Sequence, residues 1–142
     1  MTEFRKTGGE RMRWEFSETL PIYTQVMERV QRMIVSGALA PGERLPSVRA
    51  LALEAGVNPN TMQRALAELE RGGLICTQRT VGSFVTGDRE IIAEARAALA
   101  AVQTRHYLQS MAELGCSAEE IQALLRSQQT SEGRNEHVHP EL

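Results

Sequence analysis

The stretch 56–74, GVNPNTMQRALAELERGGL, constrains the fold most strongly, because it predicts a tight turn that leads into one amphipathic helix. Asn58 can cap this helix through its side-chain oxygen, and Pro59 suits the first helical position, where a missing N–H costs nothing. Apolar residues recur at steps of three and four and share one face. These residues are Met62, Ala65, Leu66 and Leu69. Gly72 and Gly73 end the helix, since glycine readily adopts the left-handed closing conformation.

The opposite face of this helix carries uncharged or positive hydrogen-bonding side chains in its first turns. They are Asn60, Thr61, Gln63 and Arg64. The carboxylates Glu68 and Glu70 come later, as they must in a helix whose N-terminal end meets phosphates and base edges in the major groove of DNA. Amide and guanidinium groups also suit paired contacts with base edges. The alternative interpretation is an ordinary solvated helix face, and the surrounding chain helps to decide between the two.

Two further helices are expected before this stretch. The apolar spacing predicts a helix over 21–36, PIYTQVMERVQRMIVS, and a second helix that follows its N-cap Ser47 and runs to residue 55. Because a short turn containing glycine joins the second helix to the third, the pair is typical of a helix-turn-helix. Residues 13–18 alternate apolar and polar side chains, which predicts a short strand.

The chain after the third helix predicts a β-hairpin. Residues 74–77 and 83–86 alternate as short strands, and the five residues 78–82, QRTVG, form the loop between them. A helix-turn-helix followed by such a hairpin is a winged helix. We expect the hairpin to place Arg79 beside the DNA backbone or in the adjacent minor groove. Gly82 would allow a close approach of the backbone to phosphate.

The rest of the chain predicts two helices whose apolar stripe has no evident partner. A long alanine-rich helix covers 90–113, and a last helix follows a capping box of Ser117 and Glu120. An exposed apolar stripe favours a symmetric dimer interface. Its candidate residues are Ile92, Ala95, Leu99, Val102, His106, Leu114, Ile121, Leu124 and Leu125. The alternative is that the two helices pack back on the winged helix and stabilise it.

These patterns predict an α+β fold with four parts. A flexible tail (1–11) precedes a winged helix-turn-helix domain of three helices and a β-hairpin wing (12–88). A small all-α dimerisation domain of two helices (89–127) and a second flexible tail (128–142) complete the chain.

The charge distribution supports this division. The net charge of −2 over 142 residues argues against a protein that coats nucleic acid without regard to sequence. The charge is unevenly distributed, however: residues 44–88 carry a net charge of +1, with arginine as their only type of basic residue, and residues 89–142 carry −3. Arginine is the side chain best matched to phosphate and guanine. The two cysteines predict no disulfide scaffold, the opening residues lack the apolar core of a signal peptide, and no run reaches the roughly 18 apolar residues of a membrane span. We therefore expect a cytoplasmic protein with no membrane partner.

Several motifs follow one another in the order and spacing of a known family. PIYTQV, Gly37 with Leu39, PGERLPSVRALA, GVNPNTMQRALAELERGGLI and GSFV resemble the GntR family of bacterial transcription regulators over residues 21–85. The short two-helix C-terminal region and the lead Trp14-Glu-Phe16 are similar to the YtrA subfamily. The resemblance implies a homodimeric repressor that binds double-stranded DNA at a palindromic operator and often controls its own operon. Members of this subfamily often lie beside ABC transporter genes.

The resemblance also assigns residues by position. Arg49 corresponds to the family's phosphate- or base-contacting arginine, and Gly82 corresponds to the wing glycine. Pro59 replaces an arginine of the fatty-acid-responsive branch, so that branch's base contact is not carried over, and the wing lacks the usual second glycine. From the helix and hairpin patterns together with the resemblance, we predict nine DNA-binding residues: Ser47, Arg49, Asn58, Asn60, Thr61, Gln63, Arg64, Arg79 and Gly82.

The sequence carries no signature of catalysis. It has no phosphate-binding glycine loop and no nucleophile elbow, so we predict that the protein is not an enzyme. His137 and His139, with His106, are too scattered and too poor in thiolates and carboxylates to predict a metal site, and no cofactor is expected. Two other functions stay open. One is a winged helix that binds an acidic protein partner, and the other is a sensor whose C-terminal domain holds an unknown small-molecule effector.

Overall fold

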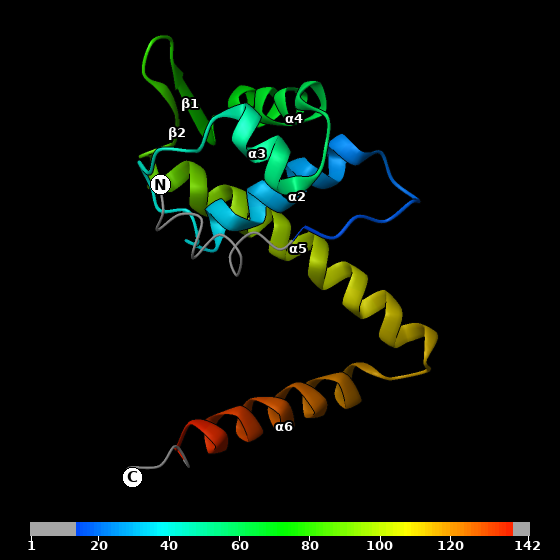
Figure 1. Ribbon diagram of the computed structural model, residues 1–142. Helices are drawn as coiled ribbons and strands as arrows, with labels where there is room; N and C mark the ends of the chain where they lie inside the picture. The colour runs from blue at the N-terminus through cyan, green and yellow to red at the C-terminus, as the bar shows by residue number, and fades with distance from the viewer. Residues whose placement is uncertain (1–13, 138–142) are drawn as a thin grey trace. The chain divides into compact units, whose positions relative to one another are not determined.

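The computed structural model describes residues 14–137, with side chains described for residues 14–131 (Figure 1). The chain divides into two compact units, Met1–Ala98 and Leu99–Leu142. In chain order the elements are α2 (Ile22–Val35), α3 (Val48–Ala55), α4 (Pro59–Arg71), β1 (Ile75–Gln78), β2 (Gly82–Val85), α5 (Arg89–Glu113) and α6 (Ala118–His137). The boundary between the units lies inside α5. The predicted fold class, a winged helix-turn-helix followed by a helical part, is confirmed.

The caps of α3 and α4 are those that the sequence predicts. The Ser47 hydroxyl accepts a hydrogen bond from the backbone N–H of Ala50 at 3.1 Å. Gly56, with φ of +72°, closes α3 in the left-handed conformation that glycine tolerates best. The side-chain oxygen of Asn58 then accepts a hydrogen bond from the N–H of Asn60 at 2.8 Å. These caps fix the tight turn between the two helices.

The core of the first unit joins the apolar faces of its helices to the hairpin. The buried side chains of α2 are Val26, Val30, Met33 and Ile34. Those of α4 are Met62, Ala65, Leu66 and Leu69, which is the face that the sequence predicts. Since burial of each large apolar side chain contributes about 1.5–3 kcal/mol, this face sets the rotation of α4 about its axis. The polar residues of α4 therefore face away from the core.

The wing is tighter than the sequence predicts. β1 and β2 pair antiparallel, with Ile75 opposite Val85 and Gln78 opposite Gly82, so that the turn between the strands has the three residues 79–81 rather than five. The predicted strands are each displaced by one residue from the observed ones.

The second edge of β2 is also occupied. Residues 42–45 run along it, as the Leu45 N–H donates to the Ser83 carbonyl at 2.8 Å and the Val85 N–H donates to the Glu43 carbonyl at 2.9 Å. An antiparallel bridge joins Arg44 to Phe84. This pairing connects the wing to the chain just before α3, and no pattern in the sequence predicts it.

The strand predicted over 13–18 is wrong for its described part, since residues 14–17 belong to no strand. Trp14 and Phe16 do share a side, as their alternation predicts, and their ring centroids lie 6.1 Å apart. Both rings are half-buried against the core of the first unit. The alternation thus reflects the packing of two rings, which needs no pairing of the backbone. Residues 1–13, including the predicted tail 1–11, lie outside the described residues.

The start of α5 belongs to the first unit. Ile92 is 6% exposed and lies in the core, and Ile91 and Ala95 pack against that core. The side chain of Asp88 accepts a hydrogen bond from the N–H of Glu90 at 3.0 Å, which begins the helix directly after the hairpin. The prediction that Ile92 lies on an unpartnered dimer stripe is therefore wrong, because its apolar partners are within the same unit.

The second unit contains the predicted break between its helices. Gly115 has φ of +83°, and the capping box that follows is confirmed. In this box the N–H of Ser117 donates to the Glu120 carboxylate, and the N–H of Glu120 donates to the Ser117 hydroxyl, both at 3.2 Å.

The last helix is longer than the sequence predicts. α6 continues to His137, whereas a flexible tail was expected from residue 128. The hydroxyl of Thr130 donates to the carbonyl of Arg126 at 2.9 Å, and that of Ser131 donates to the carbonyl of Ser127 at 3.1 Å. These are bonds to the carbonyl four residues earlier, which is how Ser and Thr side chains are accommodated inside a helix at a small cost in stability. Residues 138–142 lie outside the described residues.

Candidate nucleic-acid interface

The first turns of α4 present polar groups that have no partner within the described chain. Asn60 and Gln63 are exposed, and their side chains make no hydrogen bond with another described residue. Thr61 is half-buried between them. The first turn contains no acidic residue, so the partial positive charge of the helix N-terminus is not neutralised there. This end of α4 can donate hydrogen bonds to phosphate oxygens and to the edges of bases.

Arg64 is held against α2. Its guanidinium carbon lies 3.8 Å from the centroid of the Tyr23 ring, within the range of a cation–π interaction. A guanidinium stacked by its flat face keeps the N–H donors at its edge available for other contacts. Arg64 was predicted to bind DNA, whereas Tyr23, which lies 41 residues earlier in the chain, was not among the predicted residues. The position of Tyr23 beside the apolar stripe of α2 was the available signal.

The carboxylates of α4 lie in its second half and have partners. Glu68 forms an ion pair with Arg71 at 3.3 Å. The carboxylate of Glu70 accepts a short hydrogen bond from the hydroxyl of Thr77 in β1. The Thr77 hydroxyl also lies 3.2 Å from the hydroxyl of Ser83 in β2. These contacts join the end of α4 to both strands of the wing.

The wing places two arginines near its turn. Arg79 is an exposed residue of the turn, which closes with a bond from the Val81 N–H to the Gln78 carbonyl at 3.0 Å. Arg44 donates from Nη2 to the carbonyl of Val81 at 2.6 Å. Arg44 was not among the predicted DNA-binding residues, because no sequence pattern predicts that residues 42–45 pair with β2.

The candidates of α3 differ in what their side chains do. Ser47 and Asn58 use their side-chain oxygens as the N-caps of α3 and α4. Arg49 is exposed in the first turn of α3, and its side chain makes no hydrogen bond or ion pair with another described residue. The first unit thus carries all nine nominated DNA-binding residues, and its hairpin rises beside α4 in Figure 1.

The candidates for dimerisation are divided between the two units. Ile92 and Ala95 belong to the first unit, as described above. In the second unit Ile121 is 7% exposed, while Leu114 is 76% exposed. The exposed remainder comprises Val102, His106, Leu124 and Leu125, and Leu99 is half-buried. An apolar surface therefore exists on the second unit, but it is shorter than the predicted stripe.

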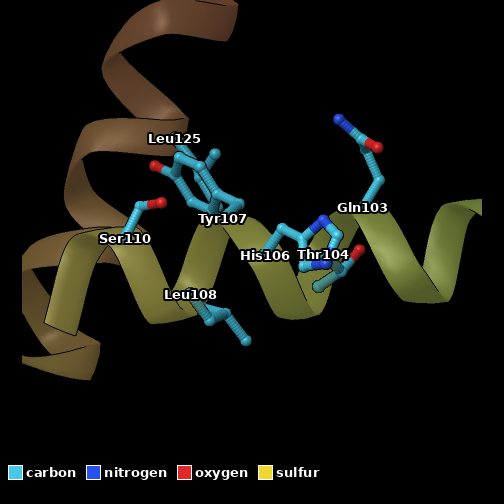
Figure 2. Close-up of a pocket in the computed structure, with 7 residues that line it drawn as sticks. All are labelled: Gln103, Thr104, His106, Tyr107, Leu108, Ser110 and Leu125. Carbon is cyan, nitrogen blue, oxygen red and sulfur yellow. The ribbon is translucent and has the colours of Figure 1, made fainter. Parts of the chain in front are cut away.

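Part of this surface is a groove. It has a volume of about 610 Å³, and its lining includes His106, Tyr107 and Ser110 from α5 and Leu125 from α6 (Figure 2). The groove is thus lined by aromatic, hydroxyl and imidazole groups.

No group of three metal-ligating side chains occurs among residues whose side chains are described. The side chains of His137 and His139, which were weighed with His106, lie outside that range. Within the described chain, no helix is both long enough and apolar enough to cross a bilayer.

A helix-turn-helix that exposes amides and arginines, followed by a two-stranded wing, defines the winged-helix class of DNA-binding regulators. The model of the gntR family of bacterial regulatory proteins matches residues 22–85. Over 107 residues the chain is 37% identical to the HTH-type transcriptional regulator YhcF of Bacillus subtilis. This match covers 75% of this chain and 88% of that protein. The chain belongs to the GntR family of transcriptional regulators.

Two further comparisons agree with this assignment. The HTH-type transcriptional repressor YtrA of Bacillus subtilis is 42% identical over 66 residues, covering 46% of this chain and 51% of that protein. A solved GntR family transcriptional regulator from Listeria monocytogenes is 37% identical, with a TM-score of 0.73, and the match covers 79% of this chain and 98% of that one. The predicted resemblance to this family and to YtrA-type regulators is confirmed.

Proposed function

We propose that this regulator is a homodimeric repressor that binds a palindromic operator and controls its own operon. The observation that carries this proposal is the exposed start of α4, where unpartnered side-chain amides and a first turn without acidic residues lie in the same unit as the wing. Sequence-specific recognition needs this combination, because phosphate contacts position a protein while base contacts select a sequence.

The proposed contacts follow from side-chain chemistry. Asn60, Gln63 and Arg64 would read bases in the major groove, since amides and guanidinium can make paired contacts with adenine and guanine. Arg49 and Arg79 would contact phosphates, because both are exposed and positive. The contacts with bases would then determine which operator is bound, and the contacts with phosphates would contribute affinity for any DNA sequence.

The dimer is proposed from the second unit. A surface carrying Leu114, Leu124 and Leu125 is more stable when a second copy covers it. Two identical heads on a palindrome also gain avidity, and the twofold symmetry of protein and operator then match. YtrA of Bacillus subtilis is called a repressor, which supports the proposed direction of regulation.

A footprint tests the operator. The full chain is incubated at physiological salt with the duplex upstream of its own gene, and a random duplex of equal length serves as the control. We expect protection of one palindrome, loss of protection when one half-site is scrambled, and derepression of a reporter when the gene is deleted. Protection of no site by the folded protein would overturn the proposal. It would favour the winged helix as a module that binds an acidic protein.

The adjacent genes and the signal are tested separately. The resemblance to YtrA-type regulators leads us to look for ABC transporter genes in the same operon. An effector in the second unit has a place to bind in the groove beside Tyr107. A thermal-shift screen should find a small molecule that raises the unfolding temperature, and that molecule should change operator affinity.

A further inference from the structure

We propose that Arg44, which no motif nominates, is a phosphate-binding residue of the wing and that Gly82 is glycine in order to seat it. This inference rests on the proposed DNA binding and adds a contact to it. The ligand would be one phosphate group of the DNA backbone.

The position of Arg44 is set by backbone pairing. Its neighbours Glu43 and Leu45 bond to Val85 and Ser83 along the edge of β2 that faces away from β1, and Arg44 itself is bridged to Phe84. Because side chains alternate along a strand, Arg44 and Glu43 point to opposite faces of this extended sheet. The Glu43 carboxylate accepts the N–H of Ala40 at 2.9 Å. Arg44 thus lies at the wing without a carboxylate partner among the described residues.

Gly82 leaves the space that the guanidinium fills. A Cβ atom on Gly82 would lie 3.1 Å from Nε, 3.3 Å from Nη2 and 3.6 Å from Cζ of Arg44. The guanidinium therefore packs on the bare backbone of the wing. Gly82 was expected to allow a close approach of the backbone to phosphate, but in the structure the group close to this glycine is the side chain of Arg44.

The seated guanidinium keeps donors for a ligand. Nη2 donates to the carbonyl of Val81 at 2.6 Å, which uses one of the five N–H groups and neutralises no charge. Arg44 is exposed, so the remaining donors can reach a phosphate oxygen. A guanidinium that is already held in place loses less conformational entropy on binding a phosphate than a freely rotating side chain does. With Arg79 in the adjacent turn, the wing would contribute two positive contacts rather than one.

The test measures binding of the full chain to a fluorescent operator duplex and to a random duplex between 50 and 200 mM salt. Arg44→Gln should weaken binding to both duplexes about tenfold at the lower salt and should reduce the log–log salt slope by about one. Arg44→Lys keeps the charge and should keep the slope. Arg96→Gln, which removes an exposed arginine from α5, is the matched control and should change neither quantity.

The seating by Gly82 is tested in a double-mutant cycle. Gly82→Ala should weaken binding by a similar factor, and the loss in Arg44→Gln/Gly82→Ala should be smaller than the product of the two single losses. Gly82 has φ of +137°, so alanine there is strained apart from any contact with Arg44. Gly37→Ala is the control for this strain, because Gly37 has φ of +87° and open space around it. Thermal unfolding of every variant identifies any loss that comes from misfolding.

The outcomes separate the two proposals. A wild-type protein that binds neither duplex overturns the proposed function and this inference with it. A wild-type protein that binds, while folded Arg44→Gln keeps its affinity and salt slope, overturns the inference about Arg44 alone. Multiplicative losses in the double mutant would overturn the role of Gly82.

Discussion

The guanidinium of Arg64 stacks on the ring of Tyr23, with 3.8 Å between its central carbon and the ring centroid. The contact joins the middle of α4 to the first turn of α2. It leaves the N–H groups at the edge of the guanidinium available, and these are the donors with which arginine binds guanine. Tyr23 therefore acts as a positioning residue for Arg64 in the proposed complex with DNA.

The first prediction concerns Tyr23. Tyr23→Leu should lower operator affinity about three- to fivefold, which corresponds to the roughly 0.5–1 kcal/mol of an exposed cation–π contact. Tyr23→Phe keeps an aromatic face and should keep most of the affinity. Fluorescence anisotropy on the operator and on random DNA measures the change, and the random duplex should show little. If Tyr23→Leu causes the same loss in an Arg64→Ala background, the two residues do not act together.

Base reading predicts a difference between two DNAs. Gln63 is exposed on α4 and its amide has no partner in the described chain, so Gln63→Ala removes little from the folded protein. We expect a cost of about 1–3 kcal/mol on the operator and almost none on random DNA. Arg64→Ala should behave in the same way. Equal losses on both duplexes would mean that these residues do not read bases.

The sequence predicted the helix-turn-helix well because its signals are local. The cap at Asn58, the glycine at 56 and the apolar spacing of α4 each depend on residues within one or two helical turns. The contacts that it missed join residues that are distant in the chain. Tyr23 with Arg64 and Arg44 with Gly82 depend on tertiary packing and on an edge pairing that no short pattern encodes.

Arg49 should act through charge. It is exposed in the first turn of α3 and is unpaired among the described residues. Arg49→Ala should weaken binding to operator and random DNA alike and reduce the salt slope by about one, because a phosphate contact carries no sequence information. Salt titrations of both duplexes give the slope. A loss confined to the operator would assign Arg49 to a base instead.

Asn58 was nominated for DNA contact, but its side-chain oxygen is the N-cap of α4. Asn58→Ala should therefore lower the free energy of unfolding by about 1 kcal/mol, whereas Asn58→Ser should restore most of it, because serine is also a good cap. Urea unfolding in the absence of DNA measures both. If Asn58→Ala leaves stability unchanged but weakens operator binding, the side chain serves DNA and not the helix.

The limits of the second unit were harder to predict for a physical reason. Helix periodicity shows which side chains share a face and does not show what covers that face. Ile92 and Leu124 fit one predicted stripe, yet Ile92 is buried in the core of the first unit and Leu124 is exposed in the second. Likewise, the polar composition after residue 127 predicts a flexible tail, yet α6 continues to His137, and the hydroxyls of Thr130 and Ser131 bond to carbonyls of the same helix.

The last prediction separates these two residues. Ile92→Ala should lower the free energy of unfolding by about 2–4 kcal/mol, because it leaves a cavity in the core, and should leave the oligomeric state unchanged. Leu124→Glu should cost little stability within a protomer, since Leu124 is 42% exposed, but should shift a dimer toward monomer by placing a charge in the proposed interface. Analytical ultracentrifugation and urea unfolding at matched concentrations measure the two effects. Leu53→Glu, at an 85% exposed position on α3, is the control for the added charge, and a dimer that survives Leu124→Glu would move the interface elsewhere.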